Sequence, residues 1–229
     1  LEKGFLQATR FSADAAHELK TPLAVLQAQI ERSLQQANDG SPEQRECAQQ
    51  LDEVQRLKSI LRKLLLLSQA DAGQLPLSLG PVNLAALVRA VAVDIEMLAP
   101  DRRVTVKAPS ELLVHGDGDF LNQVVENLVS NAIKFGDTDG LIDIELSLRD
   151  GKTLLMVTNS GPAIPQSDAE KIFDRFYRVD PSRSRETEGS GLGLSLAREF
   201  ARAHEGELSL EQSDGDLTRF ALVLPGYRQ

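Results

Sequence analysis

The sequence predicts two domains, a helical hairpin followed by an α/β domain whose sheet is largely antiparallel. Apolar residues recur at helical spacing from about residue 5 to residue 67, and turn-forming residues cluster over 71–81. Beyond that cluster the strand patterns come in hairpins, whereas strands that alternate singly with helices would indicate a parallel, doubly wound sheet. We therefore expect one domain over residues 1–74 and a second over residues 75–229.

The first domain is predicted to consist of two long antiparallel helices. The helical pattern is broken once, at residues 38–42, where Ser41 can cap a second helix that has Pro42 at its first position. Each helix carries a broad apolar stripe with spacings of three and four. The stripes consist of Leu19, Leu23, Leu26, Ile30 and Leu34 in the first helix, and of Leu51, Val54, Leu57, Leu61 and Leu64 in the second. Two helices alone cannot bury such stripes, so we expect a homodimer that forms a four-helix bundle. The alternative is that the hairpin packs against the rest of its own chain.

Mixed helix and strand patterns predict the elements of the second domain. The dipeptide Asp150-Gly151 predicts a tight turn between two of the strands, and the last two strands form a closing hairpin. Helices are expected over 84–98, 119–135 and 194–203, and strands over 103–107, 112–115, 141–148, 153–158, 207–211 and 218–224.

The composition excludes several classes of function. The chain has 229 residues and a net charge of -9, with no block of Lys or Arg that could follow a phosphate backbone, so we expect no nucleic-acid partner. A single cysteine, Cys47, excludes an internal disulfide framework. No apolar run approaches the roughly 18 residues that span a bilayer, so we expect this chain to be soluble.

A histidine with polar neighbours forms the first candidate site. His17 falls about 150° around the helix from the apolar stripe, so we expect it to face solvent, with Glu18 beside it and Thr21 one turn further on. A neutral imidazole is a competent nucleophile, and a neighbouring carboxylate can hold its tautomer and accept the released proton. Pro22 removes a backbone hydrogen bond and should bend the helix. Taken alone, such a residue is more often an ordinary surface histidine.

The string H-E-L-K-T-P-L at residues 17–23 resembles the H-box of bacterial sensor histidine kinases. The resemblance implies that His17 takes a phosphoryl group from ATP and passes it to an aspartate of a cognate response regulator. It also implies that Thr21 acts in the reverse function, in which it orients water against the phosphorylated regulator.

The predicted helix over 119–135 carries the second candidate site. Asn127, Asn131 and Lys134 lie at i, i+4 and i+7 and form a narrow polar stripe. The residues expected to face away from this stripe are Leu121, Val124, Val125, Leu128, Ala132 and Phe135. A solvated face is the alternative, although asparagine is a poor residue inside helices. Amide oxygens and an ammonium in one line suit Mg²⁺ and the phosphates that it carries. The string E-N-L-V-S-N-A-I-K-F is similar to the N-box of the same kinases, which implies that Asn131 is a magnesium ligand.

Two glycine-bearing segments follow, N-S-G-P-A-I-P at 159–165 and G-S-G-L-G-L at 189–194. Neither has the Gly-Lys-Ser/Thr of a Walker A loop, and no strand pattern precedes the second as a dinucleotide fingerprint requires. Glycine-rich backbone that opens a helix suits phosphate, but each segment taken alone could equally be a plain turn.

The order of these motifs, with F-D-R-F-Y-R at 173–178 between the glycine segments, resembles the N-box, first G-box, F-box and second G-box of histidine kinases. The resemblance covers about Phe5 to Leu224 and implies an α/β sandwich ATPase domain of the gyrase and histidine kinase type, with ATP and Mg²⁺ as cofactors. It also implies a mobile lid over 178–190. The nucleotide-binding residues that it implies are Asn127, Asn131, Lys134, Asn159, Gly161, Arg178, Gly189, Gly191 and Gly193.

Three positions depart from the family pattern. The first G-box usually opens with Asp and has a second glycine, where this chain has Asn159 and Ala163, and Phe135 stands where many members have Tyr. An amide keeps one oxygen acceptor for the adenine amino group but lacks the charge of a carboxylate. We expect Asn159 still to read adenine, with its oxygen accepting from the amine and its nitrogen donating toward the ring.

Taken together, these motifs indicate the catalytic portion of a sensor histidine kinase that phosphorylates itself on His17 and also acts as a phosphatase toward its response regulator. One alternative is a docking or phosphatase module whose ATP binding is weakened, and another is a gyrase-type ATP hydrolase. We expect the chain to be the cytoplasmic portion of an inner-membrane protein, attached to the membrane only through segments absent from this chain.

Overall fold

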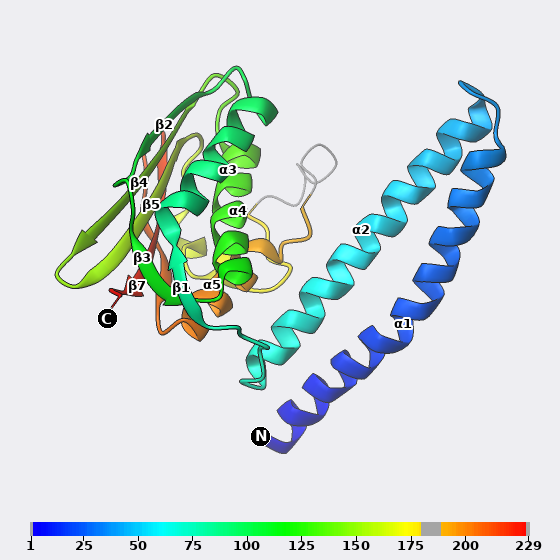
Figure 1. Cartoon of the computed structure of the whole chain (residues 1–229), viewed down its shortest axis with the longest axis horizontal. Coiled ribbons are helices and arrows are strands. Elements are labelled where there is room, and N and C mark those ends of the chain that lie inside the picture. The colour runs from blue at the N-terminus through cyan, green and yellow to red at the C-terminus, as the bar shows by residue number, and fades with distance from the viewer. Residues whose placement is uncertain (1, 180–188, 228–229) are drawn as a thin grey trace. The chain divides into compact units, whose positions relative to one another are not determined.

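The computed structural model describes the backbone of residues 2–179 and 189–227, and within these ranges all side chains except those of residues 2–17, 96 and 98. The chain divides into two compact units, Leu1–Leu75 and Pro76–Gln229 (Figure 1). Each unit is described by itself.

The first unit is the predicted helical hairpin. It consists of α1 (Glu2–Gln36) and α2 (Pro42–Asp71). The predicted cap of the second helix is confirmed, because Ser41 Oγ accepts a hydrogen bond from the Gln44 backbone N–H at 3.1 Å and Pro42 is the first helical residue. The first helix continues through Pro22, whose nitrogen cannot donate to the carbonyl four residues earlier.

The hairpin buries only part of its apolar stripes. Ile30 and Val54 lie between the two helices with 8% and 4% of their surface exposed. A polar contact also joins the helices, since Lys58 Nζ donates to Gln27 Oε1 at 2.6 Å. In contrast, Leu19 is 50% exposed and Leu57 is 43% exposed. Exposed leucine on both helices favours packing of the hairpin against a further helix pair.

We therefore predict that the chain is a dimer through its first unit. Light scattering is expected to give twice the 25.0 kDa of one chain. Leu57→Glu should lower the apparent mass, because it places a charge in the expected bundle, whereas Glu53→Gln on the same helix should not. A mass of 25.0 kDa for the parent chain at tens of micromolar would contradict the bundle.

The second unit contains a five-stranded sheet in the order β2-β4-β5-β7-β6 and a small two-stranded sheet. The β2–β4 pair is parallel, and the other pairs of the large sheet are antiparallel. The predicted α/β fold with a largely antiparallel sheet is thus confirmed. The small sheet pairs β1 (Gly80–Asn83), which is not among the strands expected from the sequence, with β3 (Leu113–Gly116). The strands of the large sheet are β2 (Arg103–Lys107), β4 (Leu141–Arg149), β5 (Lys152–Ser160), β6 (Glu207–Asp214) and β7 (Leu217–Pro225).

Helices α3 (Leu84–Leu98), α4 (Gly118–Phe135) and α5 (Gly193–Ala203) cover one face of the large sheet (Figure 1). Two single turns of 3₁₀ helix, η1 (Gln166–Asp168) and η2 (Lys171–Phe173), precede the second glycine segment. The core of this unit is mainly aliphatic, with Phe173, Phe200 and Phe220 as its buried aromatic residues. Its fully buried side chains include Leu121, Leu128, Leu196, Phe200, Ile142, Ile144, Leu155 and Phe220.

Two buried polar side chains fix the start of α4. Asp117 caps the helix, because its Oδ1 accepts from the N–H groups of Asp119 and Phe120 at 3.0 and 3.2 Å. His204, at the end of α5, accepts from the Asp117 N–H through Nε2 at 2.9 Å. Its Nδ1 therefore carries the proton and donates to Phe200 O at 2.6 Å. The end of α5 is thereby tied to the beginning of α4.

Candidate functional site

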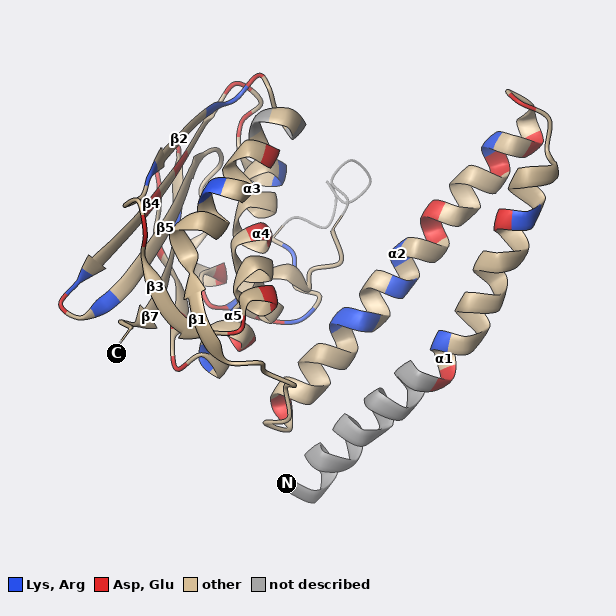
Figure 2. Cartoon of the chain, viewed as in Figure 1, with Lys and Arg blue, Asp and Glu red and all other residues tan. Residues whose placement is uncertain are grey.

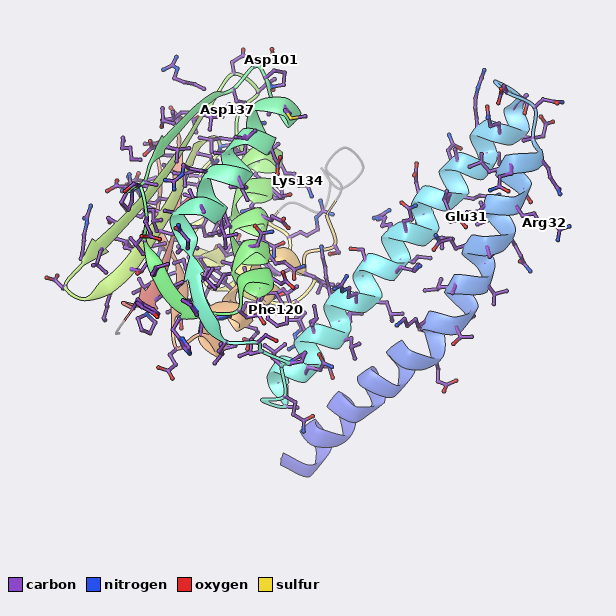
Figure 3. The ribbon with its side chains drawn as sticks, viewed as in Figure 1. Glu31, Arg32, Asp101, Phe120, Lys134 and Asp137 are labelled. Carbon is purple, nitrogen blue, oxygen red and sulfur yellow. The ribbon has the colours of Figure 1, made fainter. Side chains whose placement is uncertain are left out.

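The polar stripe of α4 exists as predicted. Its opposite face is buried, with Leu121, Val124, Val125, Leu128 and Ala132 at 1% exposure or less. Asn127 and Asn131 are half-buried, and Lys134 projects from the last turns of the helix (Figure 3). One expectation needs correction, because Phe135 is the last helical residue and is 51% exposed rather than packed with the apolar face.

The start of α5 lies against this stripe. Gly193 is the first residue of α5, and a Cβ placed on it would lie 3.2 Å from Asn127 Oδ1. The Asn127 Nδ2 atom is buried and has no hydrogen-bond partner among the described residues. A buried amide donor without a partner costs about 1–3 kcal/mol. A phosphate oxygen of a bound nucleotide would supply the missing acceptor, so this part of the site fits the ligand that the motifs imply.

The end of β5 lies against the end of α4. Gly161 has φ +153°, and a Cβ on it would lie 2.7 Å from Phe135 O and 3.0 Å from Gly136 Cα. This close approach requires glycine, and it places the first glycine segment beside the polar stripe. Asn159, on the same strand, is 4% exposed. Its Nδ2 donates to Ser160 O at 3.3 Å, so one of the amide hydrogens expected to reach adenine is used within the chain.

The F-box and the second glycine segment lie side by side. Phe176 N–H donates to Gly191 O at 3.0 Å, and Arg178 Nη1 donates to Gly189 O at 3.0 Å. Gly191 has φ +68°, and a Cβ on it would lie 2.8 Å from the Phe176 carbonyl carbon. Both stems of the predicted lid are therefore joined, while its residues 180–188 lie outside the described part of the chain.

A tyrosine and an aspartate hold the F-box to the preceding segment. The Tyr177 hydroxyl bonds the Asp168 carboxylate, which lowers the pKa of Asp168 and raises the pKa of Tyr177. Lys171 Nζ lies 3.5 Å from the same carboxylate and lowers its pKa further. Asp168 therefore stays ionised near neutral pH and keeps accepting from Tyr177.

The donor set around α4 suits a magnesium ion that arrives with a nucleotide. No group of three or more His, Cys, Asp or Glu side chains is placed to hold a metal within the described residues. The available ligand is the neutral Asn131 oxygen, and Mg²⁺ commonly takes one or two protein ligands and fills its shell with phosphate and water oxygens. Asn131 can therefore hold Mg²⁺ only together with phosphate.

The predicted phospho-acceptor group lies in the other unit. His17 lies on α1, and its side chain is outside the described residues. Glu18 and Thr21 are exposed on the same helix. The residues predicted to bind the nucleotide lie in the second unit, where contacts join the end of β5 and the start of α5 to α4, whereas these three residues belong to the first unit.

Charges are mixed along the hairpin. On α2 the Asp and Glu residues lie mainly in the first half of the helix, and the Lys and Arg residues mainly in the second half (Figure 2). Neither sign of charge dominates that helix. Among the helices that the structure describes, none combines the length and the apolar character required of a membrane-spanning segment.

The fold and the site define an ATPase domain joined to a phospho-acceptor helical hairpin. The family model described as "Histidine kinase-, DNA gyrase B-, and HSP90-like ATPase" matches residues 116–228. The model described as "His Kinase A (phospho-acceptor) domain" matches residues 7–73. The chain belongs to the sensor histidine kinase family.

Similar proteins agree with this assignment. The "Probable sensor protein PcoS" of Escherichia coli is 36% identical over 217 residues, which are 95% of this chain and 47% of that protein. The sensor histidine kinase CusS of Escherichia coli K12 is 36% identical over 226 residues, which are 98% of this chain and 47% of CusS. The chain thus spans about half the length of the curated relatives it matches.

Solved structures show the same architecture. The catalytic domain of the histidine kinase ThkA, in a nucleotide-free form, superposes with a TM-score of 0.58 at 30% identity over 65% of this chain and 96% of that domain. Full-length ShkA in complex with AMPPNP superposes with a TM-score of 0.81 at 24% identity over 96% of this chain and 46% of ShkA. The ShkA match supports the fold of both units.

Proposed function

We propose that this chain phosphorylates itself on His17 with ATP and passes the phosphoryl group to an aspartate of a response regulator. The observation that carries the proposal is that the start of α5 lies against Asn127, whose buried Nδ2 has no hydrogen-bond partner among the described residues, in a chain that also matches a phospho-acceptor domain. In this proposal residues 1–74 are the dimerisation and phosphotransfer domain, and residues 75–229 bind ATP.

In this proposal, different residues bind the adenine, the phosphates and the metal ion. Asn159 accepts from the adenine amino group through its oxygen, while its Nδ2 donates to Ser160 O. Asn127 and the glycines at 189, 191 and 193 bind phosphate oxygens, and Arg178 holds the lid stem. Lys134 offsets the charge of the γ-phosphate. Mg²⁺ held by Asn131 would offset phosphate charge as the leaving group departs.

The transfer of the phosphoryl group needs no reactant other than ATP and the His17 imidazole. A nitrogen of the neutral His17 imidazole attacks the γ-phosphorus, the bond to the bridging oxygen breaks, and ADP leaves with that electron pair. The imidazole proton passes to Glu18 or to water. The phosphoryl group then moves from nitrogen to a carboxylate oxygen of the regulator.

The proposal is tested by incubating the full chain with Mg²⁺ and ATP labelled at the γ-phosphate. We expect one phosphate per chain that is labile in acid and stable in base, as expected of a phosphohistidine. Failure to bind ATP would favour the docking module. Release of inorganic phosphate without labelled protein would favour an ATP hydrolase.

Thr21 is predicted to affect dephosphorylation without affecting autophosphorylation. It lies one helical turn beyond His17, so its hydroxyl can orient water without touching the nucleophile. The Thr21→Ala variant should therefore acquire phosphate on His17 at the parent rate. The phosphorylated cognate regulator should have a longer lifetime in the presence of this variant than in the presence of the parent. Equal regulator lifetimes with the two proteins would contradict this role.

Asn159 is predicted to contribute to ATP affinity. Replacing it with alanine removes a neutral hydrogen bond, so Asn159→Ala should weaken ATP binding by about 0.5–1.5 kcal/mol. Asn159→Asp should retain or tighten ATP binding, since a carboxylate accepts more strongly than an amide. Nucleotide titration measures both. If Asn159→Ala binds ATP as well as the parent does, adenine is held elsewhere.

We also propose that the parent protein is held at the inner membrane through segments outside this chain, which places this portion in the cytoplasm. The length of the relatives supports this proposal, because the chain covers 47% of PcoS and of CusS.

A further inference from the structure

We infer that Arg102 is a positioning residue of the nucleotide site, which orients the Asn159 amide and fixes the last turn of α4 without touching the nucleotide. The inference rests on the proposed function. No motif points to Arg102, which lies just before β2, far from the site in sequence.

The first observation is the capping of α4 by the Arg102 guanidinium. Arg102 is half-buried, and its Nη1 donates to Ala132 O at 2.9 Å while its Nη2 donates to Gly136 O at 3.2 Å. Ala132 O also accepts from the Gly136 N–H at 3.0 Å, so the guanidinium is its second donor. Carbonyls at this end of a helix carry its negative partial charge. A planar cation that binds two of them holds this turn in place. Asn131 and Lys134 lie within two residues of Ala132.

The second observation is that Arg102 holds one side of a peptide group whose other side contacts β5. Gly136 O and the Asp137 N–H belong to the same peptide. The oxygen accepts from Arg102, and the N–H donates to Ser160 O at 2.9 Å. Asp137 directly follows the Gly136 cap at the end of α4 (Figure 3). Arg102 therefore holds the Gly136–Asp137 peptide, and the N–H of this peptide in turn holds the Ser160 carbonyl.

The third observation concerns the orientation of the Asn159 amide. Ser160 O also accepts from Asn159 Nδ2 at 3.3 Å. Rotating the amide by half a turn would place its oxygen against this carbonyl, so the bond selects the rotamer that keeps Oδ1 available. An available oxygen accepts from the adenine amine, whereas guanine presents a carbonyl oxygen at the corresponding position. The orientation of a neutral amide thus favours ATP over GTP.

The atoms around Gly136 are closely packed, so the contacts described above have little room to shift. A Cβ on Gly136 would lie 2.5 Å from Ala132 O, 2.9 Å from Arg102 Nη1 and 3.0 Å from Ser160 O. The helix end, the guanidinium and the strand end therefore converge on one glycine. Loss of the guanidinium would leave Ala132 O with the Gly136 N–H alone and would remove the donor that holds Gly136 O, which is one of the two contacts that fix the Gly136–Asp137 peptide.

The test compares Arg102→Ala with a matched arginine. Arg89 also bonds two backbone carbonyls of the same unit, with Nη1 2.7 Å from Pro109 O and Nη2 2.6 Å from Ser110 O, but neither carbonyl belongs to the site or to α4. The full chain and its variants are titrated with ATP and with GTP in the presence of Mg²⁺, and their melting temperatures are measured. We expect Arg102→Ala to weaken ATP binding about tenfold and GTP binding less, so that the ATP preference falls. Arg89→Ala should keep the parent affinities.

Arg102→Lys provides the second variant, because an ammonium can bond one of the two carbonyls. Its ATP affinity should lie between those of the parent and Arg102→Ala, and it carries the test if Arg102→Ala does not fold. Parent-like ATP affinity in the Arg102 variants, or an equal loss for ATP and GTP, would overturn the inference and leave the proposed function intact. A parent chain without ATP affinity would overturn both.

Discussion

His17→Ala is expected to abolish the acid-labile phosphate that the parent chain acquires from Mg²⁺ and ATP. The substitution removes the imidazole nitrogen that attacks the γ-phosphorus, and no neighbouring side chain in the H-box string can replace it. The phosphate on the variant should fall below detection rather than decrease by a small factor.

Two controls separate loss of the nucleophile from loss of structure. The nucleotide site lies in the other unit, so His17→Ala should bind ATP with the parent affinity. The chain has three histidines, and His115 is also exposed, on β3, so His115→Ala should still be phosphorylated at the parent level. Label that persists in His17→Ala would refute the assignment of the phospho-acceptor.

Gly161→Ala is expected to weaken ATP binding by about tenfold or more, which corresponds to roughly 1.4 kcal/mol. The new Cβ would lie 2.7 Å from Phe135 O and 3.0 Å from Gly136 Cα, and both contacts are with backbone that cannot rotate away. Either β5 or the end of α4 must shift, and these two segments carry Asn159 and Lys134. Strain at a positive φ adds to this cost.

Gly151→Ala is the matched control for this substitution. Gly151 also has a positive φ, +74°, but a Cβ there would meet nothing within 4 Å. Both variants should lose stability from backbone strain, whereas only Gly161→Ala should lose ATP affinity. Equal ATP affinities for the two variants, measured by titration, would show that the contact between β5 and α4 does not shape the site.

Most elements of the fold could be predicted from local sequence patterns. The period of α4, the Ser41 cap and the Asp150-Gly151 turn depend on residues close in sequence, and the structure confirms all three. Strand β1 was missed because it is four residues long, begins with Gly-Pro, and is defined by its pairing with β3. Its strand conformation depends on partner residues 30 to 36 positions away.

Only those residues of the candidate site that belong to a sequence motif could be predicted. The asparagines of α4 and the glycines of both segments follow from spacing and resemblance. By contrast, Arg102 bonds carbonyls 30 and 34 positions away, and His204 bonds a backbone N–H 87 positions away. These residues support the site through contacts that form only on folding, so no local pattern marks them.

The most direct test of the account is to locate the phosphate on the protein. The full chain is incubated with Mg²⁺ and ATP, digested at neutral to basic pH, and analysed by mass spectrometry with fragmentation that preserves the nitrogen–phosphorus bond. We predict a single phosphate on the imidazole of His17. A phosphate on any other residue, or none in a chain that binds ATP, would contradict the account.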